Sequence, residues 1–382
     1  MNACLQDVAL LNPRLATSFQ PESTVSFVPM AAVSAEKACI TVAVDKPYSE
    51  VSKGYTSFQN GDVLVAKITP CFENGKIAQA LIPRQFGFGS TEFHVIRPKP
   101  ERLDGRYLHH FLRQPRIRAE GEERMTGSGG QRRVPTSFLS QLVIHTPPLP
   151  EQRRIAAILD QADALRAKRR EALAQLDSLT QSIFMEMFGD TVINPKRFPM
   201  MSISEITDKG RGLQLQPDTS VWNLNLDQIE SNTGRIHEKV ICRLEQLGSS
   251  TFPFKAGTVL YSKLRPYLNK VVIADEDGYA TTELVPIRCK QDIVKPIFLA
   301  TFLRSKRFLD FANLTVAGAK MPRMVMDSFW SYTLPLPDLA LQNEFERKFK
   351  AVEKLISIQR SSIVKLDTLF SSLQHRAFQG KL

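Results

Sequence analysis

The segment FQNGDVLVAKITP, residues 58–70, occurs a second time in the chain as FKAGTVLYSKLRP, residues 254–266. The two segments lie 196 residues apart, and in both a run of aliphatic residues stands between a glycine and a proline. Such runs between turn residues are typical of short strands. Besides the leading phenylalanine, five positions recur unchanged, as Gly61 and Gly257, Val63 and Val259, Leu64 and Leu260, Lys67 and Lys263, and Pro70 and Pro266.

Three further pairs of segments keep nearly the same separation. They are STEFHVIR from Ser90 and TTELVPIR from Thr281, HHFLR ending at Arg113 and ATFLR ending at Arg304, and VPTSFLSQLVIHTPPLP from Val134 and MPRMVMDSFWSYTLPLP from Met321. Half of the 382-residue chain is 191 residues, so these offsets indicate a duplication of the whole chain and not a short solenoid repeat. Two equivalent halves in one polypeptide predict a pseudo-two-fold molecule that contacts two equivalent partners.

The pattern of each half predicts an α+β domain followed by a long helix. Short strand-like runs such as VLVAKI and VLYSKL precede helix-like segments, LHHFLR in the first half and FLATFLR in the second. We therefore expect two similar α+β domains at residues 1–150 and 190–338, separated by two long helices at residues 151–189 and 339–382. The helices are bounded by prolines before them and by Gly189 and Gly380 after them, where a C′ glycine belongs.

Both long helices carry apolar residues at alternating steps of three and four, which is the pattern of a coiled-coil seam. The first seam is Ile155, Ile158, Ala162, Leu165, Arg169, Ala172, Leu176, Leu179 and Ile183, and the second is Phe345, Phe349, Val352, Ile356, Gln359, Ile363, Leu366, Phe370, Leu373 and Ala377.

The polar seam members Arg169 and Gln359 each lie near the middle of a helix. An antiparallel pair would bring them together, with facing residue numbers that sum to about 528. The alternative is two helices that dock separately on their own domains.

The chain is basic, with 50 Lys and Arg against 39 Asp and Glu, a net charge of +11 and a pI near 9.4. The first helix is neutral and the second carries +3, so about +8 lies in the two α+β domains. This distribution favours a polyanionic partner such as nucleic acid over the alternative of a basic protein without such a partner.

We expect a cytoplasmic protein, because the start MNACLQDVALLNP does not have the pattern of a signal peptide and no apolar run is long enough to span a membrane. The five cysteines, Cys4, Cys39, Cys71, Cys242 and Cys289, form no CxxC pair. Buried free thiols are therefore expected in place of disulfides or a zinc site.

The helical segments resemble a known family. PPLPEQRRIAAILDQADAL from Pro147, the helix end MFGD and the terminal LQHRAFQGKL are similar to the two conserved regions of the DNA-specificity subunit of type I restriction-modification systems. The second copy departs from the first, reading LPLPDLALQNEF, although Gln342 stands where the first has Gln152. The resemblance implies two target recognition domains, at 1–150 and 190–338, that alternate with two conserved helices forming an antiparallel coiled coil.

The resemblance also implies a role. Such a subunit performs no chemistry; it binds double-stranded DNA, two modification (methyltransferase) subunits and, through them, restriction subunits. Each recognition domain reads one half of a bipartite target, and S-adenosylmethionine, ATP and magnesium are expected on the partner subunits. The alternative is a scaffold of a phage-defence complex that has no sequence-specific DNA binding of its own.

Motifs of catalysis are missing from the sequence, so we expect no enzyme activity, cofactor or metal in this chain. There is no phosphate-binding GxxxxGK[ST] loop, and neither NPRL at Asn12 nor NPKR at Asn194 supplies the motif of an amino-methyltransferase. FGFGS at Phe86 superficially suggests a methyl-donor loop, but the second half keeps only one of its glycines. His109 and His110 are expected to be core or surface histidines.

The best candidates for DNA contact are two loops rich in glycine and basic residues. Glycines let the backbone approach phosphate, and arginine can clamp phosphate or read guanine. The candidate residues of the first half are Lys67, Lys76, Gly129, Gly130, Gln131, Arg132 and Arg133, and those of the second half are Lys263, Arg265, Lys270, Lys320 and Arg323. Arg132 is expected to contact phosphate, whereas the role of Arg133 is left open. An ordinary solvated turn is the alternative for the loops, and edge lysines are the alternative for Lys67 and Lys263.

Overall fold

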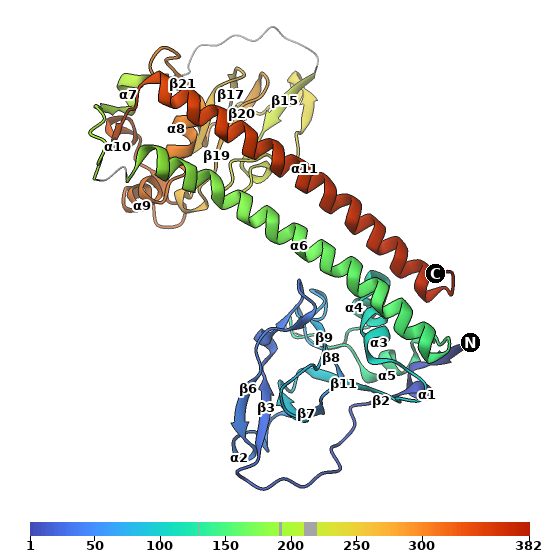
Figure 1. The fold of residues 1–382 in the computed structure, drawn as a ribbon. Coiled ribbons are helices and arrows are strands. Elements are labelled where there is room, and N and C mark those ends of the chain that lie inside the picture. Colours follow the sequence, from blue (N-terminus) through green and yellow to red (C-terminus); the bar gives the residue numbers. More distant parts are fainter. Residues whose placement is uncertain (129, 191–192, 210–219) are drawn as a thin grey trace. The chain divides into compact units, whose positions relative to one another are not determined.

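The computed structural model describes residues 1–128, 130–190, 193–209 and 220–382 (Figure 1). Two compact units make up the chain: the first contains residues 1–170 and 361–382, and the second contains residues 171–360. The long helices α6 (Leu149–Phe188) and α11 (Leu339–Phe378) each contribute residues to both units. The domain boundaries at residues 150, 189 and 338 stay a prediction.

The first unit contains two four-stranded sheets. The order β2-β11-β8-β9 is antiparallel throughout, whereas β6-β3-β10-β7 contains the parallel pair β3 and β10. Its strands are β1 (Asn2–Cys4), β2 (Ala9–Leu11), β3 (Thr24–Val28), β4 (Val33–Ser34), β5 (Cys39–Ile40), β6 (Val44–Pro47), β7 (Thr56–Gln59), β8 (Val63–Ala66), β9 (Ile77–Gln79), β10 (Phe86–Gly89), β11 (Phe93–Pro98) and β12 (Val143–His145). The duplicated segment VLVA is β8, and all four of its residues are buried.

The second unit repeats this topology, with sheets β14-β21-β18-β19 and β16-β15-β20-β17, and β15 is again parallel to β20. Its strands are β13 (Met200–Ser202), β14 (Thr207–Lys209), β15 (Ser220–Leu224), β16 (Ile241–Arg243), β17 (Thr251–Phe254), β18 (Val259–Ser262), β19 (Val271–Ile273), β20 (Gly278–Thr281), β21 (Leu284–Cys289), β22 (Val316–Ala317), β23 (Arg323–Met324) and β24 (Thr333–Pro335). The duplication predicted from the sequence is therefore a duplication of the fold.

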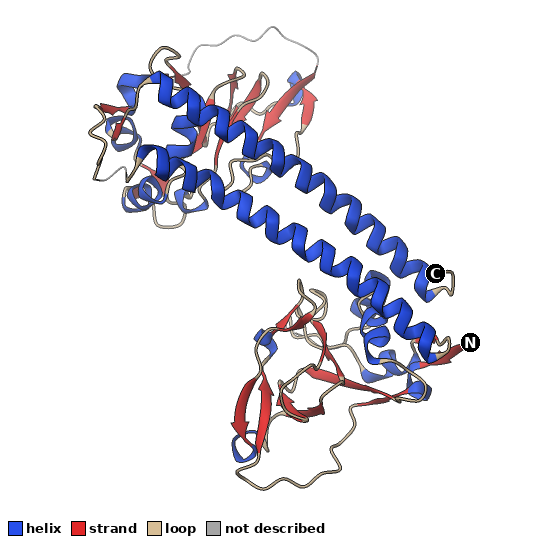
Figure 2. Ribbon diagram, in the orientation of Figure 1, coloured by secondary structure: helices blue, strands red, loops and turns tan. Residues whose placement is uncertain are grey.

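Short helices cover one sheet in each unit and join it to the long helices (Figure 2). In the first unit they are α1 (Leu5–Val8), α3 (Gly105–Leu112), α4 (Pro115–Glu123) and α5 (Thr136–Gln141). Helix α2 (Tyr48–Val51) packs instead on the sheet that contains β3 and β10, and the first unit also has a 3-10 turn, η1 (Met30–Ala32). In the second they are α7 (Ile203–Ile206), α8 (Pro296–Leu303), α9 (Lys306–Leu314) and α10 (Met326–Ser331), with 3-10 turns η2 (Leu226–Gln228), η3 (Leu244–Gln246) and η4 (Pro266–Leu268).

Aromatic residues join the long helices to each core. In the first unit Tyr107 and Phe111 of α3 pack against Phe378 of α11, with ring centroids 4.9 and 5.4 Å apart. In the second unit Phe184 of α6 lies 5.4 Å from Phe345 of α11. In the first unit Arg166 of α6 also donates to Asp367 near the end of α11 at 2.5 Å. Helix α6 therefore contacts the later part of α11 in one unit and its start in the other, and the antiparallel coiled coil expected from the sequence is confirmed. The numbers of Phe184 and Phe345 sum to 529, whereas those of Arg166 and Asp367 in the first unit sum to 533, so the single register value of 528 stays a prediction.

The two glutamines near the helix starts have the same role in both units. Gln152 is fully buried; it accepts a hydrogen bond from the Asp104 amide at 2.8 Å and donates to the Arg102 and Pro147 carbonyl oxygens at 2.9 and 2.8 Å. Gln342 is buried equally and makes the equivalent three bonds to Lys295, Ile293 and Pro337. Each glutamine therefore fixes the entry of a long helix to the domain before it.

The seam predicted for α6 is wrong in part. All ten seam positions of α11 are buried or half-buried, but Leu165 and Leu179 of α6 are 53% and 39% exposed, and Arg169 is exposed as well. The reason is that α6 packs against the short helices of each unit as well as against α11. Its buried residues therefore do not all lie on the single stripe that a coiled-coil seam predicts. Arg169 belongs to the first unit and Gln359 to the second, so the meeting of their side chains stays a prediction.

The FGFGS segment forms strand β10, not a ligand-binding loop. A Cβ at Gly87 would lie 2.3 Å from the Phe58 ring, and one at Gly89 would lie 2.4 Å from the Val28 carbonyl oxygen. These glycines are therefore required by close packing. None of the helices in the described ranges is long and apolar enough to cross a membrane.

Candidate nucleic-acid interface

The basic loop of the first unit is tied to the end of β8. The Val134 amide donates to the Lys67 carbonyl oxygen at 2.8 Å, and the Thr69 amide donates to the Arg132 carbonyl oxygen at 2.9 Å. Gly127 has a φ of +126°, and a Cβ there would lie 2.6 Å from the Gln131 carbonyl oxygen. The loop therefore needs glycine at its start to fold back.

A carboxylate holds one of the two adjacent arginines. Arg133 donates from Nε and Nη2 to Glu92 at 3.0 and 2.9 Å, and from Nη1 to the Gln131 carbonyl oxygen at 3.2 Å. The hydrogen bonds from Arg133 hold the pKa of Glu92 below its ordinary value. Because all three nitrogens are engaged, Arg133 could read a base only after it had released some of these partners.

The same clamp occurs in the second unit. Arg323 donates to Glu283 from Nε at 3.1 Å and from Nη2 at 2.8 Å, and this lowers the pKa of Glu283. The Met324 amide donates to the Lys263 carbonyl oxygen at 2.8 Å, as Val134 does to Lys67. Both arginines keep about the same exposure, 41% for Arg133 and 42% for Arg323. Each domain thus presents a lysine and a clamped arginine side by side.

The other loop residues are more exposed. The Arg132 side chain is 44% exposed, and its Nη2 lies 3.9 Å from Glu73 and 4.0 Å from Glu122, too far for hydrogen bonds. Gly130, Gln131, Arg265 and Lys320 are exposed, whereas Gly129 lies outside the described residues. Arg132 can therefore turn towards a phosphate without losing a strong partner.

Lys76 and Lys270 have an internal contact that sequence reasoning missed. Lys76 Nζ donates to the Met30 carbonyl oxygen at 3.0 Å, and Lys270 Nζ donates to the Leu226 carbonyl oxygen at 2.6 Å. Each lysine attaches a 3-10 turn to the hairpin that carries it. A role for these lysines in DNA binding stays a prediction.

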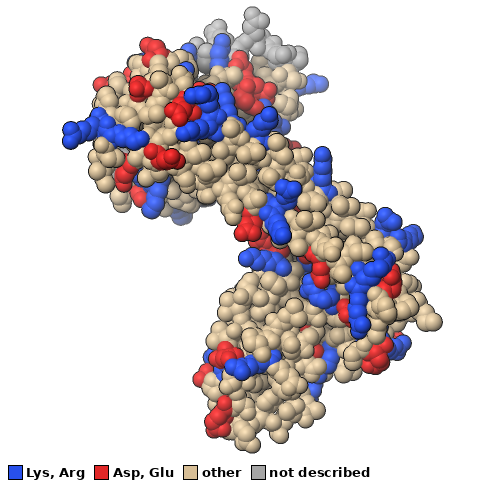
Figure 3. Space-filling model, in the orientation of Figure 1, with Lys and Arg blue, Asp and Glu red and all other residues tan. Residues whose placement is uncertain are grey.

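Sequence reasoning also missed Glu92 and Glu283. A signal was present, since both stand at the third position of the duplicated segments STEFHVIR and TTELVPIR. A glutamate that recurs beside recurring basic residues is a candidate ion-pair partner. Basic and acidic side chains are also interspersed elsewhere on the surface, and Figure 3 shows no single continuous blue patch on the face it presents.

The family described as "Type I restriction modification DNA specificity domain" matches residues 4–175. Over 181 residues the chain is 38% identical to the EcoAI specificity subunit of Escherichia coli, and it is 37% identical to the EcoEI specificity subunit of the same species. The first half of the chain therefore contains a type I restriction modification DNA specificity domain. The first alignment covers 47% of this chain and 31% of the EcoAI subunit, and the second covers 47% and 30%.

More distant members of the family match over a larger part of the chain. The MjaVIII specificity subunit of Methanocaldococcus jannaschii is 21% identical, over 78% of this chain and 74% of that protein. A chain of a solved type I restriction-modification system has the same fold, with a TM-score of 0.61 and 18% identity over 100% of this chain and 98% of that chain. The S subunit from M. genitalium has a TM-score of 0.53 and 12% identity over 99% and 96%.

Proposed function

We propose that this chain is the DNA-specificity subunit of a type I restriction-modification complex and that it performs no chemistry itself. The observation that carries the proposal is the duplicated arrangement of Lys67, Glu92 and Arg133 in one domain and Lys263, Glu283 and Arg323 in the other. Two similar but non-identical basic sites on one chain suit a target with two different halves. Half-site spacing is set by the geometry of the protein that binds them.

The helices support the proposed docking of two modification subunits. In the first unit Leu165, Val364 and Leu369 are 53%, 65% and 51% exposed. In the second unit Leu355 and Ile358 are 48% and 52% exposed. Exposed aliphatic residues on a helical face suit a protein partner. Restriction subunits would join through the modification subunits, which would also carry S-adenosylmethionine, while ATP and magnesium would act on partner subunits.

The test is to map methylated bases in cells that carry the complete system, before and after residues 190–338 are exchanged for those of a related subunit. The expected result is methylation at two short half-sites with a fixed spacer, of which the exchange alters one. A change in both half-sites of the target would contradict the interpretation that each domain recognises one half-site. A methylation pattern that no exchange of either domain alters would favour the scaffold alternative.

A further inference from the structure

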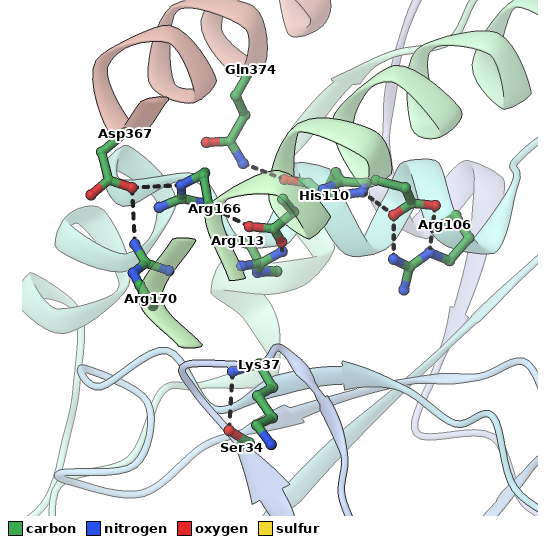
Figure 4. A network of polar contacts seen from close by, with 11 residues as sticks. Ser34, Lys37, Arg106, His110, Arg113, Arg166, Arg170, Asp367 and Gln374 are labelled. Atoms are coloured by element: carbon green, nitrogen blue, oxygen red, sulfur yellow. Dashed lines mark hydrogen bonds and ion pairs between the residues drawn. The ribbon is translucent and has the colours of Figure 1, made fainter. Parts of the chain in front are cut away.

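A cavity of about 280 Å³ in the first unit is lined mainly by arginines. It lies between α6, the helices α3 and α4 and two turns of the domain. Its lining residues are Ala35, Glu36, Asn74, Gly75, Arg113, Arg118, Arg166 and Arg170, and we call it the arginine cavity. Figure 4 shows three of these arginines across from the hairpin that carries Ser34 and Lys37.

Two carboxylates hold three of the arginines in place. Asp163 accepts from Arg113 at 2.5 Å and from Arg166 at 2.7 Å, while Asp367 accepts from Arg166 at 2.5 Å and from Arg170 at 2.9 Å (Figure 4). The Arg113 and Arg166 side chains are each only 14% exposed, so their positions are set by packing. The wall of the cavity is therefore preorganised and keeps an excess of positive charge.

The fourth arginine, Arg118, has an unsatisfied donor. Its Nε is buried and has no hydrogen-bond partner among the described residues. Its guanidinium lies against Gly75, where a Cβ would be 2.8 Å from Nη1. Glu36, the acidic residue of the lining, is exposed. A buried donor beside excess positive charge indicates a site for an anion with several oxygen acceptors.

The equivalent region of the second unit has matched charges, although Arg235 Nε and Arg360 Nε are also buried without a hydrogen-bond partner among the described residues. Arg235 pairs with Asp177 at 2.6 Å and with Glu353 at 3.1 Å, and Arg360 pairs with Glu230 at 3.0 Å. Both carboxylates that meet Arg235 come from the long helices, so here the loop from the domain closes onto them with matched charge. At the offset of 191 residues, Leu309 of the second half stands at the position of Arg118.

The arginine cavity adjoins the candidate interface of its own domain. Helix α4 carries Arg118 and, one turn later, Glu122, which lies 4.0 Å from Arg132. Residues one turn apart on a helix are roughly 5–6 Å apart at Cβ. Phosphates of one DNA strand follow one another about every 3.4 Å along the axis. A strand that contacts Arg132 can therefore place a neighbouring phosphate at the cavity.

We propose that the arginine cavity binds one backbone phosphate of the DNA beside the half-site read by the first domain, and that the second unit makes no such contact. This inference rests on the proposed function. Guanidinium groups match phosphate oxygens in pairs, and a phosphate contact carries no base information. The first half-site is then bound with a stronger dependence on salt than the second.

The test uses Arg118→Gln in the assembled complex, titrated on its own target at several salt concentrations. The matched control is Arg116→Gln, which removes the same charge from the same helix at a side chain that is 71% exposed. We expect Arg118→Gln to lower the slope of log affinity against log salt by about 0.9 and to weaken variants of the half-site equally. A slope that is unchanged, or that falls equally in the control, would overturn the proposal.

A second variant, Glu36→Gln, controls for the possibility that Arg118→Gln misfolds. Removing the negative charge at the cavity should raise affinity and steepen the salt slope, which misfolding does not do. Methylphosphonate substitution of single phosphates should identify one position beside the first half-site that matters in the wild type and not in Arg118→Gln. If Arg118→Gln instead prevents assembly with the modification subunit, the cavity serves a protein contact and the inference is wrong.

These outcomes separate the inference from the proposed function. If the wild-type complex shows no preference for a bipartite target, the proposed function fails. If the wild type is specific and Arg118→Gln behaves as the control does, only the phosphate contact fails.

Discussion

Replacing Gln152 with alanine should loosen the junction between the first domain and α6. The side chain is fully buried and makes three hydrogen bonds of 2.8 to 2.9 Å to backbone groups. A hydrogen bond contributes about 1 kcal/mol net, and a buried donor left without a partner costs about 1–3 kcal/mol. With the Asp104 amide and two carbonyl groups losing their partner, we expect a loss of about 2–4 kcal/mol in local stability.

The assay is amide hydrogen exchange, which reports the free energy of local opening. The Asp104 amide should exchange roughly 30- to 1,000-fold faster, because every 1.4 kcal/mol is a factor of about ten. Gln152→Glu is the matched variant: it keeps an acceptor for the Asp104 amide but faces the Arg102 and Pro147 carbonyls with a carboxylate. Gln342→Ala should produce the same change in the second unit only. Exchange at Asp104 within threefold of the wild type would refute this reasoning.

Three further perturbations test other parts of the structure. Phe184→Ala should cost the second unit about 3–5 kcal/mol in denaturant unfolding, because the ring is 1% exposed among other phenylalanines, whereas Met185→Ala, at a side chain 49% exposed, should cost far less. Glu92→Gln should release Arg133 from its ion pair. In filter-binding titrations the assembled complex should then bind non-target DNA a few-fold more tightly and discriminate less between target and non-target DNA. Burial lowers the pKa of His109 and His110 below 6.5, so both stay neutral in the folded state. Their contribution to stability is complete above pH 6.5 and is lost as the pH falls towards their lowered values, by up to about 1.4 kcal/mol per pH unit for each. The protection factors of amides in the first unit, which correct for the pH dependence of intrinsic exchange, should therefore decrease as the pH is lowered below 6.5.

Much of the fold could be predicted because it depends on patterns that repeat along the sequence. The matched segments at 58–70 and 254–266 revealed the duplication, and the three-four spacing of apolar residues revealed the long helices. The α6 seam was wrong at Leu165 and Leu179 because a heptad pattern describes a helix that packs on one partner. Here the same helix also packs on α3 in one unit and on α8 in the other.

The polar site was less predictable because its contacts join residues far apart in the sequence. Arg133 and Glu92 are 41 residues apart, and the local sequence around neither residue predicts their ion pair. The loop residues were identified from their chemistry, since glycine and arginine are the residue types that suit phosphate contact. The arginine cavity could not have been found this way, because Arg113 and Arg166 come together only through the packing of α3 on α6.

The division of each long helix between two units has a consequence for synthesis. Residues 361–382 complete the first unit, yet they leave the ribosome after all 190 residues of the second unit, 171–360. At about 5–20 residues per second that delay is roughly 10–40 s. During this interval Tyr107 and Phe111 have no Phe378 to pack against. The first domain to be translated is therefore the last to be finished, and nascent chains depend on the second domain being made before the first can close.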